Sequence, residues 1–235
     1  RVFCDIPGVG LHSIRIDMLH CFYLGVAQDF CAACLWLCIT EKIFVQHKTQ
    51  DETEILSIMQ IRQKLWAWYS VQERENPDQQ LTRLDDLTVK MLGPRAEPEM
   101  KSKGAETKCL IPFCVYLLRQ HTEALGSKGR IFVKCGEALI GFMDVLKSSP
   151  RRMDVESLQR LHDHTLNLIL YWDGAGLAFK PKMHLLVHLV HFASWSGNPS
   201  YHTTFADEGM NKVLADIARS AHRAVFEYRV FAHFN

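Results

Sequence analysis

Apolar residues recur with helical spacing along most of the chain from Met18 onward. Residues three and four positions apart share one face of a helix, so this spacing predicts amphipathic helices. The pattern predicts helices over residues 18–40, 51–72, 81–92, 107–125, 129–149, 154–172 and 180–192, and a last one from about residue 207.

Two of these predicted helices carry a clear apolar stripe that we expect to face the core. In the helix over 51–72 the residues that follow helical spacing are Ile55, Met59, Arg62, Trp66 and Tyr69. In the helix over 154–172 they are Leu158, Leu161, Thr165, Leu168 and Trp172.

The helical pattern is interrupted at the start of the chain and once in the middle. Ile14 and Ile16 alternate with polar residues, and a period of two predicts a short strand that ends at Asp17. Prolines and glycines in the polar stretch 93–106 predict a loop. We therefore expect a mainly α, bundle-like fold with one or two short strands near the N-terminus. Its parts would be residues 1–17, a helical region over 18–175 and C-terminal helices over 176–235.

The most apolar run, FCAACLWLCI at 30–39, lies between Asp29 and Glu41. Such a run is shorter than the roughly 20 residues that cross a bilayer, so it predicts a buried core helix and no membrane contact. Three cysteines crowd this helix and suit a disulfide framework poorly, so we expect reduced, intracellular thiols. The net charge of +1 provides no global basic field, and any DNA contact would come from local patches.

Three histidines, His184, His188 and His191, lie on one face of a predicted helix. Imidazoles on adjacent turns can bind one zinc ion. However, the stretch lacks the glutamate of the H-E-x-x-H motif and has no obvious carboxylate nearby. Two interpretations remain, and packed histidines with hydrogen-bond partners are favoured over a zinc site.

Two segments together carry a family resemblance. Residues 14–30, IRIDMLHCFYLGVAQDF, resemble the D-x-M-H-x-x-x-L-G-V segment of CACTA-type transposases and their relatives. KPKMHLLVHL, from residue 180, resembles their N-x-H-L-x-x-H-L segment, and GNPSYHTTFADEGMNKVL at 197–214 corresponds to the Gly-Pro and F-E-R-x-N-G stretch that follows. The chain departs from that stretch by losing its arginine and by having Asn198 in place of the glycine. These departures bear on catalytic competence more than on ancestry.

The resemblance implies an RNase H-like fold, in which carboxylates bind two Mg²⁺ or Mn²⁺ ions that promote DNA strand cleavage and transfer. On this resemblance Asp17 is the second catalytic acid and Glu208 the third, both as metal ligands. The first acid would lie upstream of Arg1. The chain would then be a fragment of a nuclear protein that binds transposon ends. It would contain a remnant of the catalytic core together with the helical insertion of that core, and it would be inactive alone.

Each acid also has a structural interpretation. Asp17 could cap the helix that follows it, and Glu208 could form an ordinary ion pair with Lys212 on a solvated face. Basic side chains of the same helix, Lys212, Arg219 and Arg223, could bind DNA phosphates, but they are too few to establish DNA binding. The alternative function is a non-catalytic helical scaffold or interaction module without metal.

Overall fold

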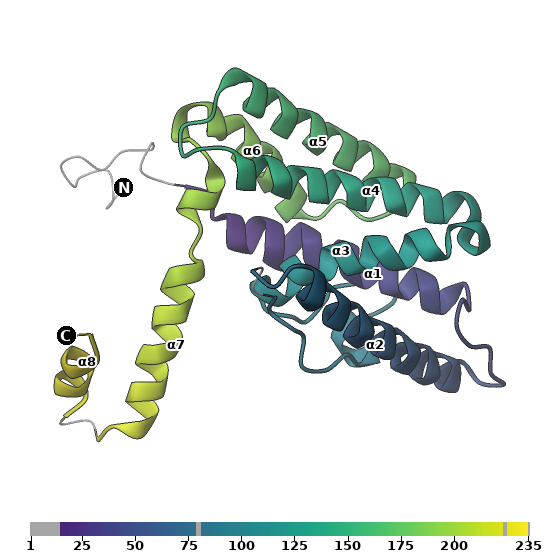
Figure 1. Ribbon diagram of the computed structural model, residues 1–235, viewed down its shortest axis with the longest axis horizontal. Coiled ribbons are helices and arrows are strands. Elements are labelled where there is room, and N and C mark those ends of the chain that lie inside the picture. The colour runs from purple at the N-terminus through teal and green to yellow at the C-terminus, as the bar shows by residue number, and fades with distance from the viewer. Residues whose placement is uncertain (1–14, 79–80, 223–224, 235) are drawn as a thin grey trace.

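The computed structural model describes residues 15–78, 81–222 and 225–234, with all their side chains except those of 206–209, 211, 212 and 234. Figure 1 shows its helices. In chain order they are η3 (Leu19–Val26), α1 (Ala27–Thr40), α2 (Gln50–Glu75), η4 (Val89–Leu92), α3 (Gly104–Gln120), α4 (Thr122–Ser148), α5 (Val155–Gly174), α6 (Pro181–Ser196), η5 (Pro199–His202), α7 (Phe205–Ser220) and α8 (Phe226–Phe234).

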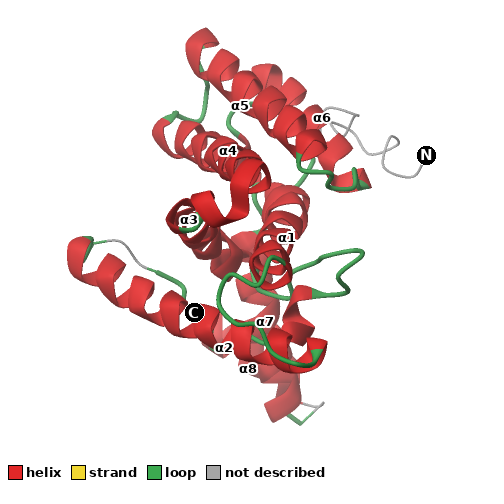
Figure 2. Ribbon diagram, turned by 90° about the vertical axis from the view of Figure 1, so that its right-hand side faces the viewer, coloured by secondary structure: helices red, strands yellow, loops and turns green. Residues whose placement is uncertain are grey.

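The prediction of a mainly α fold is confirmed, but the predicted N-terminal strand is not found in the described part of the chain (Figure 2). Residues 15–17 are irregular and lead directly into helix, and the rest of the predicted strand lies outside the described residues. The physical reason is local: the carbonyl of Asp17 accepts a hydrogen bond from the Cys21 amide at 3.0 Å, which starts a helix. The described residues therefore give no support for a remnant of an RNase H-like sheet.

The core of the bundle is built around η3 and α1. These two helices form one apolar stretch, Leu19–Thr40, that is long enough to cross a membrane, but 89% of its most apolar window is buried inside the protein. Figure 1 shows α1 and α3 between the layer of α4, α5 and α6 and the long helix α2. A helix that is apolar on all sides suits this central place, as predicted for residues 30–39.

Cysteines occupy part of this core as free thiols. Cys31, Cys34 and Cys38 of α1 are fully buried, as is Cys114 on the neighbouring helix α3. Burial raises the pKa of the Cys31 and Cys34 thiols well above the usual value. These two side chains therefore act as small neutral packing groups.

Helix α2 presents a different face to the core from the one predicted. The stripe residues Ile55, Met59 and Trp66 are 54%, 42% and 40% exposed. Tyr69 of the predicted stripe is buried, and the other inward-facing residues of α2 are ones that the stripe did not include: Ile58, Ile61, Leu65 and Trp68. The predicted stripe of α5 does face the core. The predicted helix over 81–92 was wrong apart from the short 3₁₀ turn of η4, since the residues before it are irregular.

The last two helices extend away from the bundle. Figure 1 shows α7 leaving the bundle near the described N-terminal residues and α8 packing at its far end. Phe205, the first residue of α7, contacts Tyr23 of η3 with ring centroids 5.5 Å apart. Further along, Met210, Tyr228 and Phe231 are exposed. The start of α7 is therefore held by the bundle, while the rest of the helix contacts α8 and leaves Met210 exposed.

Candidate functional site

Asp17 lies where η3 and α7 begin, and its carboxylate accepts hydrogen bonds from both. Oδ1 accepts from the amides of Leu19, at 3.3 Å, and Thr204, at 2.9 Å. Oδ2 accepts from the His20 amide at 3.1 Å and the Thr204 hydroxyl at 2.8 Å, and it also pairs with Nδ1 of His20. One side chain thus satisfies amides at the start of two helices, although Asp17 and Thr204 are 187 residues apart in the sequence.

The surroundings of Asp17 favour its charged form. Burial raises the pKa of the carboxyl, but hydrogen bonds from His20 and Thr204 outweigh it and leave the pKa below the usual value. The positive ends of the two helix dipoles act in the same direction. Asp17 is therefore ionised at neutral pH.

This geometry does not fit a magnesium or manganese ligand. A carboxylate has about four lone-pair sites, and protein donors already surround both oxygens of Asp17. Within the described residues, no group of three His, Cys, Asp or Glu side chains comes together around Asp17 or elsewhere. The structure supports the capping interpretation of Asp17.

Glu208 belongs to α7, four residues after Thr204. At 1.5 Å per residue its backbone lies about 6 Å along the helix from the residue that Asp17 holds. The side chain of Glu208 lies outside the described residues. The structure therefore brings the two predicted acids to the same end of α7 without placing the second carboxylate.

The segments that carry the resemblance also meet through Lys180, which comes just before α6. Its ammonium group forms an ion pair with Asp29 of α1 at 2.9 Å and donates to the carbonyl of Pro98 at 3.2 Å. Burial raises the pKa of Asp29, although the hydrogen bond from Lys180 opposes this rise. The contact joins α1, the loop before α3 and the start of α6.

Lys182 makes a second connection and explains a glycine of the first segment. Its ammonium donates to the carbonyl of Leu24, and its own carbonyl accepts from the Cys21 thiol at 3.4 Å. A Cβ atom at Gly25 would lie 2.4 Å from Cδ of Lys182. Gly25 is therefore needed for close packing of α6 on η3.

Asn198 is a structural residue. In the sequence it is notable only because it replaces the glycine of the Gly-Pro pair in the resembling segment. It is fully buried, and its side-chain amide donates to the carbonyls of Leu146 and Ser149 at 2.8 and 2.9 Å. The side-chain oxygen of Asn198, Oδ1, accepts hydrogen bonds from the backbone amide and the hydroxyl of Ser200. Asn198 thereby fixes the turn after α6 to the end of α4.

Only one of the three predicted phosphate-binding side chains is placed. Arg219 is exposed on α7 and pairs with Asp216 at 3.0 Å, an exposed contact that contributes little to stability. The side chain of Lys212 and the whole of Arg223 lie outside the described residues. The described basic surface of α7 is therefore a single arginine.

Two of the three histidines on α6 come together. Nε2 of His184 and Nε2 of His188 are 2.9 Å apart, with the rings edge to face and their centroids separated by 4.5 Å. His191 instead contacts Phe192, with ring centroids 5.8 Å apart. The predicted three-histidine zinc site is thus reduced to a pair.

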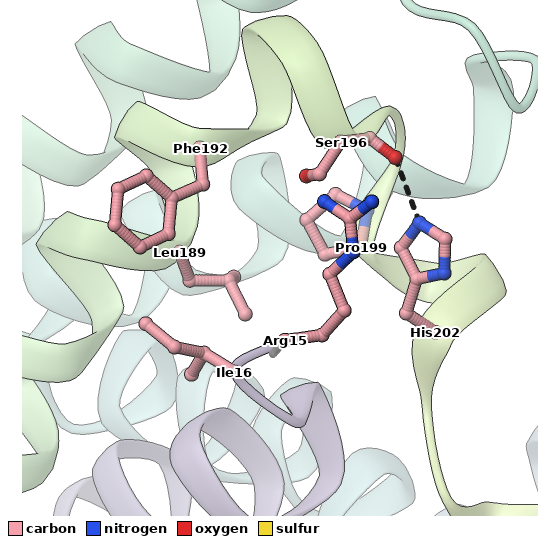
Figure 3. Close-up of a pocket in the computed structure, with 7 residues that line it drawn as sticks. All are labelled: Arg15, Ile16, Leu189, Phe192, Ser196, Pro199 and His202. Atoms are coloured by element: carbon pink, nitrogen blue, oxygen red, sulfur yellow. Dashed lines mark hydrogen bonds between the residues drawn. The ribbon is translucent and has the colours of Figure 1, made fainter. Parts of the chain in front are cut away.

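A small hollow lies beyond the end of this histidine row, where Arg15 and Ile16 meet α6 and η5. Figure 3 shows its lining, with the ring of His202 hydrogen-bonded to the carbonyl of Ser196 at 2.8 Å. Its volume of about 10 Å³ is room for one water molecule at most. It is too small for an organic ligand.

No family model matches the chain, and comparisons with curated proteins and with solved structures also give no match.

Proposed function

We propose that this chain is the helical part of a nuclear protein related to the CACTA-type transposases. The activity of the parent family would be metal-dependent DNA strand cleavage and transfer at transposon ends. The observation that carries the proposal is that the two segments with the resemblance, 14–30 and 180–214, pack against each other.

Their contacts involve the positions of the resemblance itself. Asp17 binds Thr204, and Gly25 gives room to Lys182. Segments that form one site in a family must meet in the folded chain, whereas two chance matches are under no such constraint. The packing therefore supports a common origin for the two matches.

We further propose that this chain does not cleave DNA by itself. The carboxylate of Asp17 is engaged with the starts of two helices, and the arginine of the F-E-R stretch is missing. Any Mg²⁺ or Mn²⁺ would belong to a more complete core. The activity left to the chain is DNA contact through the basic side chains of α7.

A second candidate is a non-catalytic helical interaction module. It is favoured by the structural use of Asp17 and by the exposed apolar side chains of α2, α7 and α8. The two candidates differ in one measurable property. Phosphate contacts release counterions and make binding depend on salt, whereas a module that binds only protein shows no such DNA binding.

Fluorescence anisotropy with a labelled DNA duplex, at several salt concentrations, tests the proposal. We expect binding that weakens with salt, and Arg219→Ala should reduce the slope of log K against log salt by about 1. Arg160→Ala is the matched control, because this arginine is also exposed but lies on α5 and not on α7. Absence of binding, or an equal effect of both variants, would contradict the proposal and favour the interaction module.

Incubation of the same duplex with Mg²⁺ or Mn²⁺ tests the proposed inactivity. We expect no cleavage by the wild-type chain. Cleavage that Asp17→Asn abolishes would show that Asp17 is catalytic, and would overturn the interpretation of this residue as a cap.

A further inference from the structure

We infer that His184 and His188 form a surface site for one divalent transition-metal ion of the Zn²⁺ class. This site is separate from the proposed carboxylate chemistry and does not depend on the transposase relationship. The inference rests on the geometry of the pair: two imidazole nitrogens, one helical turn apart, aim at each other across 2.9 Å.

The observed separation is close to what a shared metal needs. Zinc binds imidazole nitrogen at about 2.0–2.1 Å, so two nitrogens at a tetrahedral angle are about 3.3 Å apart. From 2.9 Å the two rings need to separate by only about 0.4 Å, which small side-chain rotations provide. One Nε2 of the neutral pair carries the hydrogen of this bond; on metal binding that ring would carry its proton on Nδ1 instead, and both Nε2 lone pairs would bind the ion.

The pair is held in place before any ion binds. Met183, Leu186 and Leu189 bury the opposite side of α6 in the bundle, so the helix that carries both histidines is fixed. The ring of His188 stacks on Phe192, with centroids 5.8 Å apart and an interplanar angle of 29°. A pre-organised pair loses little conformational freedom on binding, which favours affinity.

Open positions for water or another ligand are available beside the pair. His184 also lines an open groove of about 470 Å³, together with Phe179 and Met183. With two protein ligands, the remaining coordination positions would be filled from this side. Such a site resembles an open, exchangeable zinc site more than a closed structural one.

Isothermal titration calorimetry of the untagged protein with ZnCl₂ or NiCl₂, at slightly alkaline pH, tests the inference. We expect one saturable ion per chain, and a loss of affinity of at least about tenfold for both His184→Ala and His188→Ala. His191→Ala is the matched control, because His191 is exposed on the same helix but is not part of the pair; it should keep the wild-type affinity.

Nitrogen-15 NMR of the histidine rings gives a readout that does not depend on the variants. Zinc should shift the Nε2 resonances of His184 and His188 and leave that of His191 unchanged. The inference is overturned if the wild-type chain shows no saturable binding, if His191→Ala weakens binding as much as the other two variants, or if the two Nε2 resonances do not move.

Discussion

Replacing Asp17 by asparagine should destabilise the protein far more than the same change at an ordinary helix cap. In the native chain both carboxylate oxygens accept hydrogen bonds from N–H or O–H donors. Asparagine keeps one acceptor oxygen and turns a donor group toward the remaining donors. With its oxygen in the Oδ1 position, asparagine loses the bond from the His20 amide and the negative charge, while the Thr204 hydroxyl can turn to accept from the new NH2 group. In the other orientation it loses the bonds from the amides of Leu19 and Thr204.

The expected magnitude follows from these lost contacts. Hydrogen bonds to a charged group contribute about 1.5–3 kcal/mol each when buried. The side chain of Asp17 is 20% exposed, so the lower end of that range applies. We expect Asp17→Asn to lower the free energy of unfolding by about 2–3 kcal/mol.

The matched control is Asp154→Asn. The side chain of Asp154 caps α5 by accepting one hydrogen bond, from the amide of Ser157 at 2.7 Å. Asparagine caps equally well there, so the change should stay within about 0.5 kcal/mol.

Urea unfolding at neutral pH measures both variants, and hydrogen exchange at the Thr204 amide reports the local effect. Exchange at Thr204 should be faster in Asp17→Asn and unchanged in Asp154→Asn. The reasoning is refuted if both variants lose the same small amount of stability and Thr204 keeps its protection.

The contribution of Asp17 should also depend on pH in a defined direction. Its pKa is lower in the folded chain than the value of about 3.9 expected when unfolded, so ionisation favours folding. The stabilisation is therefore complete above about pH 4 and is lost as the pH falls through the folded pKa. The difference in unfolding free energy between wild type and Asp17→Asn should be constant near neutral pH and shrink below about pH 4.

Three further substitutions test the packing around the site by urea unfolding. Lys180→Met should cost about 3 kcal/mol because it leaves Asp29 buried without its partner, and adding Asp29→Asn should restore part of the loss. Asn198→Ala should cost about 2–4 kcal/mol, since two buried carbonyls lose their donor; a loss below 1 kcal/mol would contradict the described bonds. Gly136→Ala should cost about 1–3 kcal/mol because its Cβ would lie 2.4 and 2.8 Å from two core side chains, and a neutral effect would mean that the core repacks freely.

How far the fold can be predicted from sequence depends on how many apolar faces each helix has. Helix α5 has one long stripe, and its Leu161, Leu168 and Trp172 are buried as predicted, whereas Leu166 and Leu170 outside the stripe are exposed. Helix α2 has two, and spacing alone cannot say whether Ile55 or Ile58 turns inward. The choice is made by the neighbouring helices, which the sequence of α2 does not contain.

Two element predictions that the described residues do not support have a similar cause. Alternation before Asp17 favours a strand, but a strand also needs a partner, and the described chain has none to pair with. Over 81–92 the spacing favours a helix, but Tyr69 of α2 instead uses its hydroxyl to bind the Leu84 amide at 3.3 Å. Tertiary contacts therefore decide both segments.

For the candidate site, the sequence indicates which residues have a role, but it does not indicate which groups their side chains contact. Asp17 and Lys182 both lie in the matched segments, but the contacts of Asp17 with Thr204 and of Lys182 with Leu24 join positions more than 150 residues apart. Asn198 gave only a negative signal, because it replaced an expected glycine. A rule that examines polar residues between two predicted helices for a capping role would have found it.

The identity of residue 17 illustrates why sequence alone leaves its role open. Metal binding and helix capping both use an ionised carboxylate, so an aspartate at this position suits either one. A simple cap accepts serine, threonine or asparagine as well. Here the residue accepts bonds from η3 and from α7 at once, and only a carboxylate offers two acceptor oxygens for that purpose. On the proposed relationship, an aspartate inherited from a metal site would be retained here for folding, and a large loss of stability in Asp17→Asn is the result that this role requires.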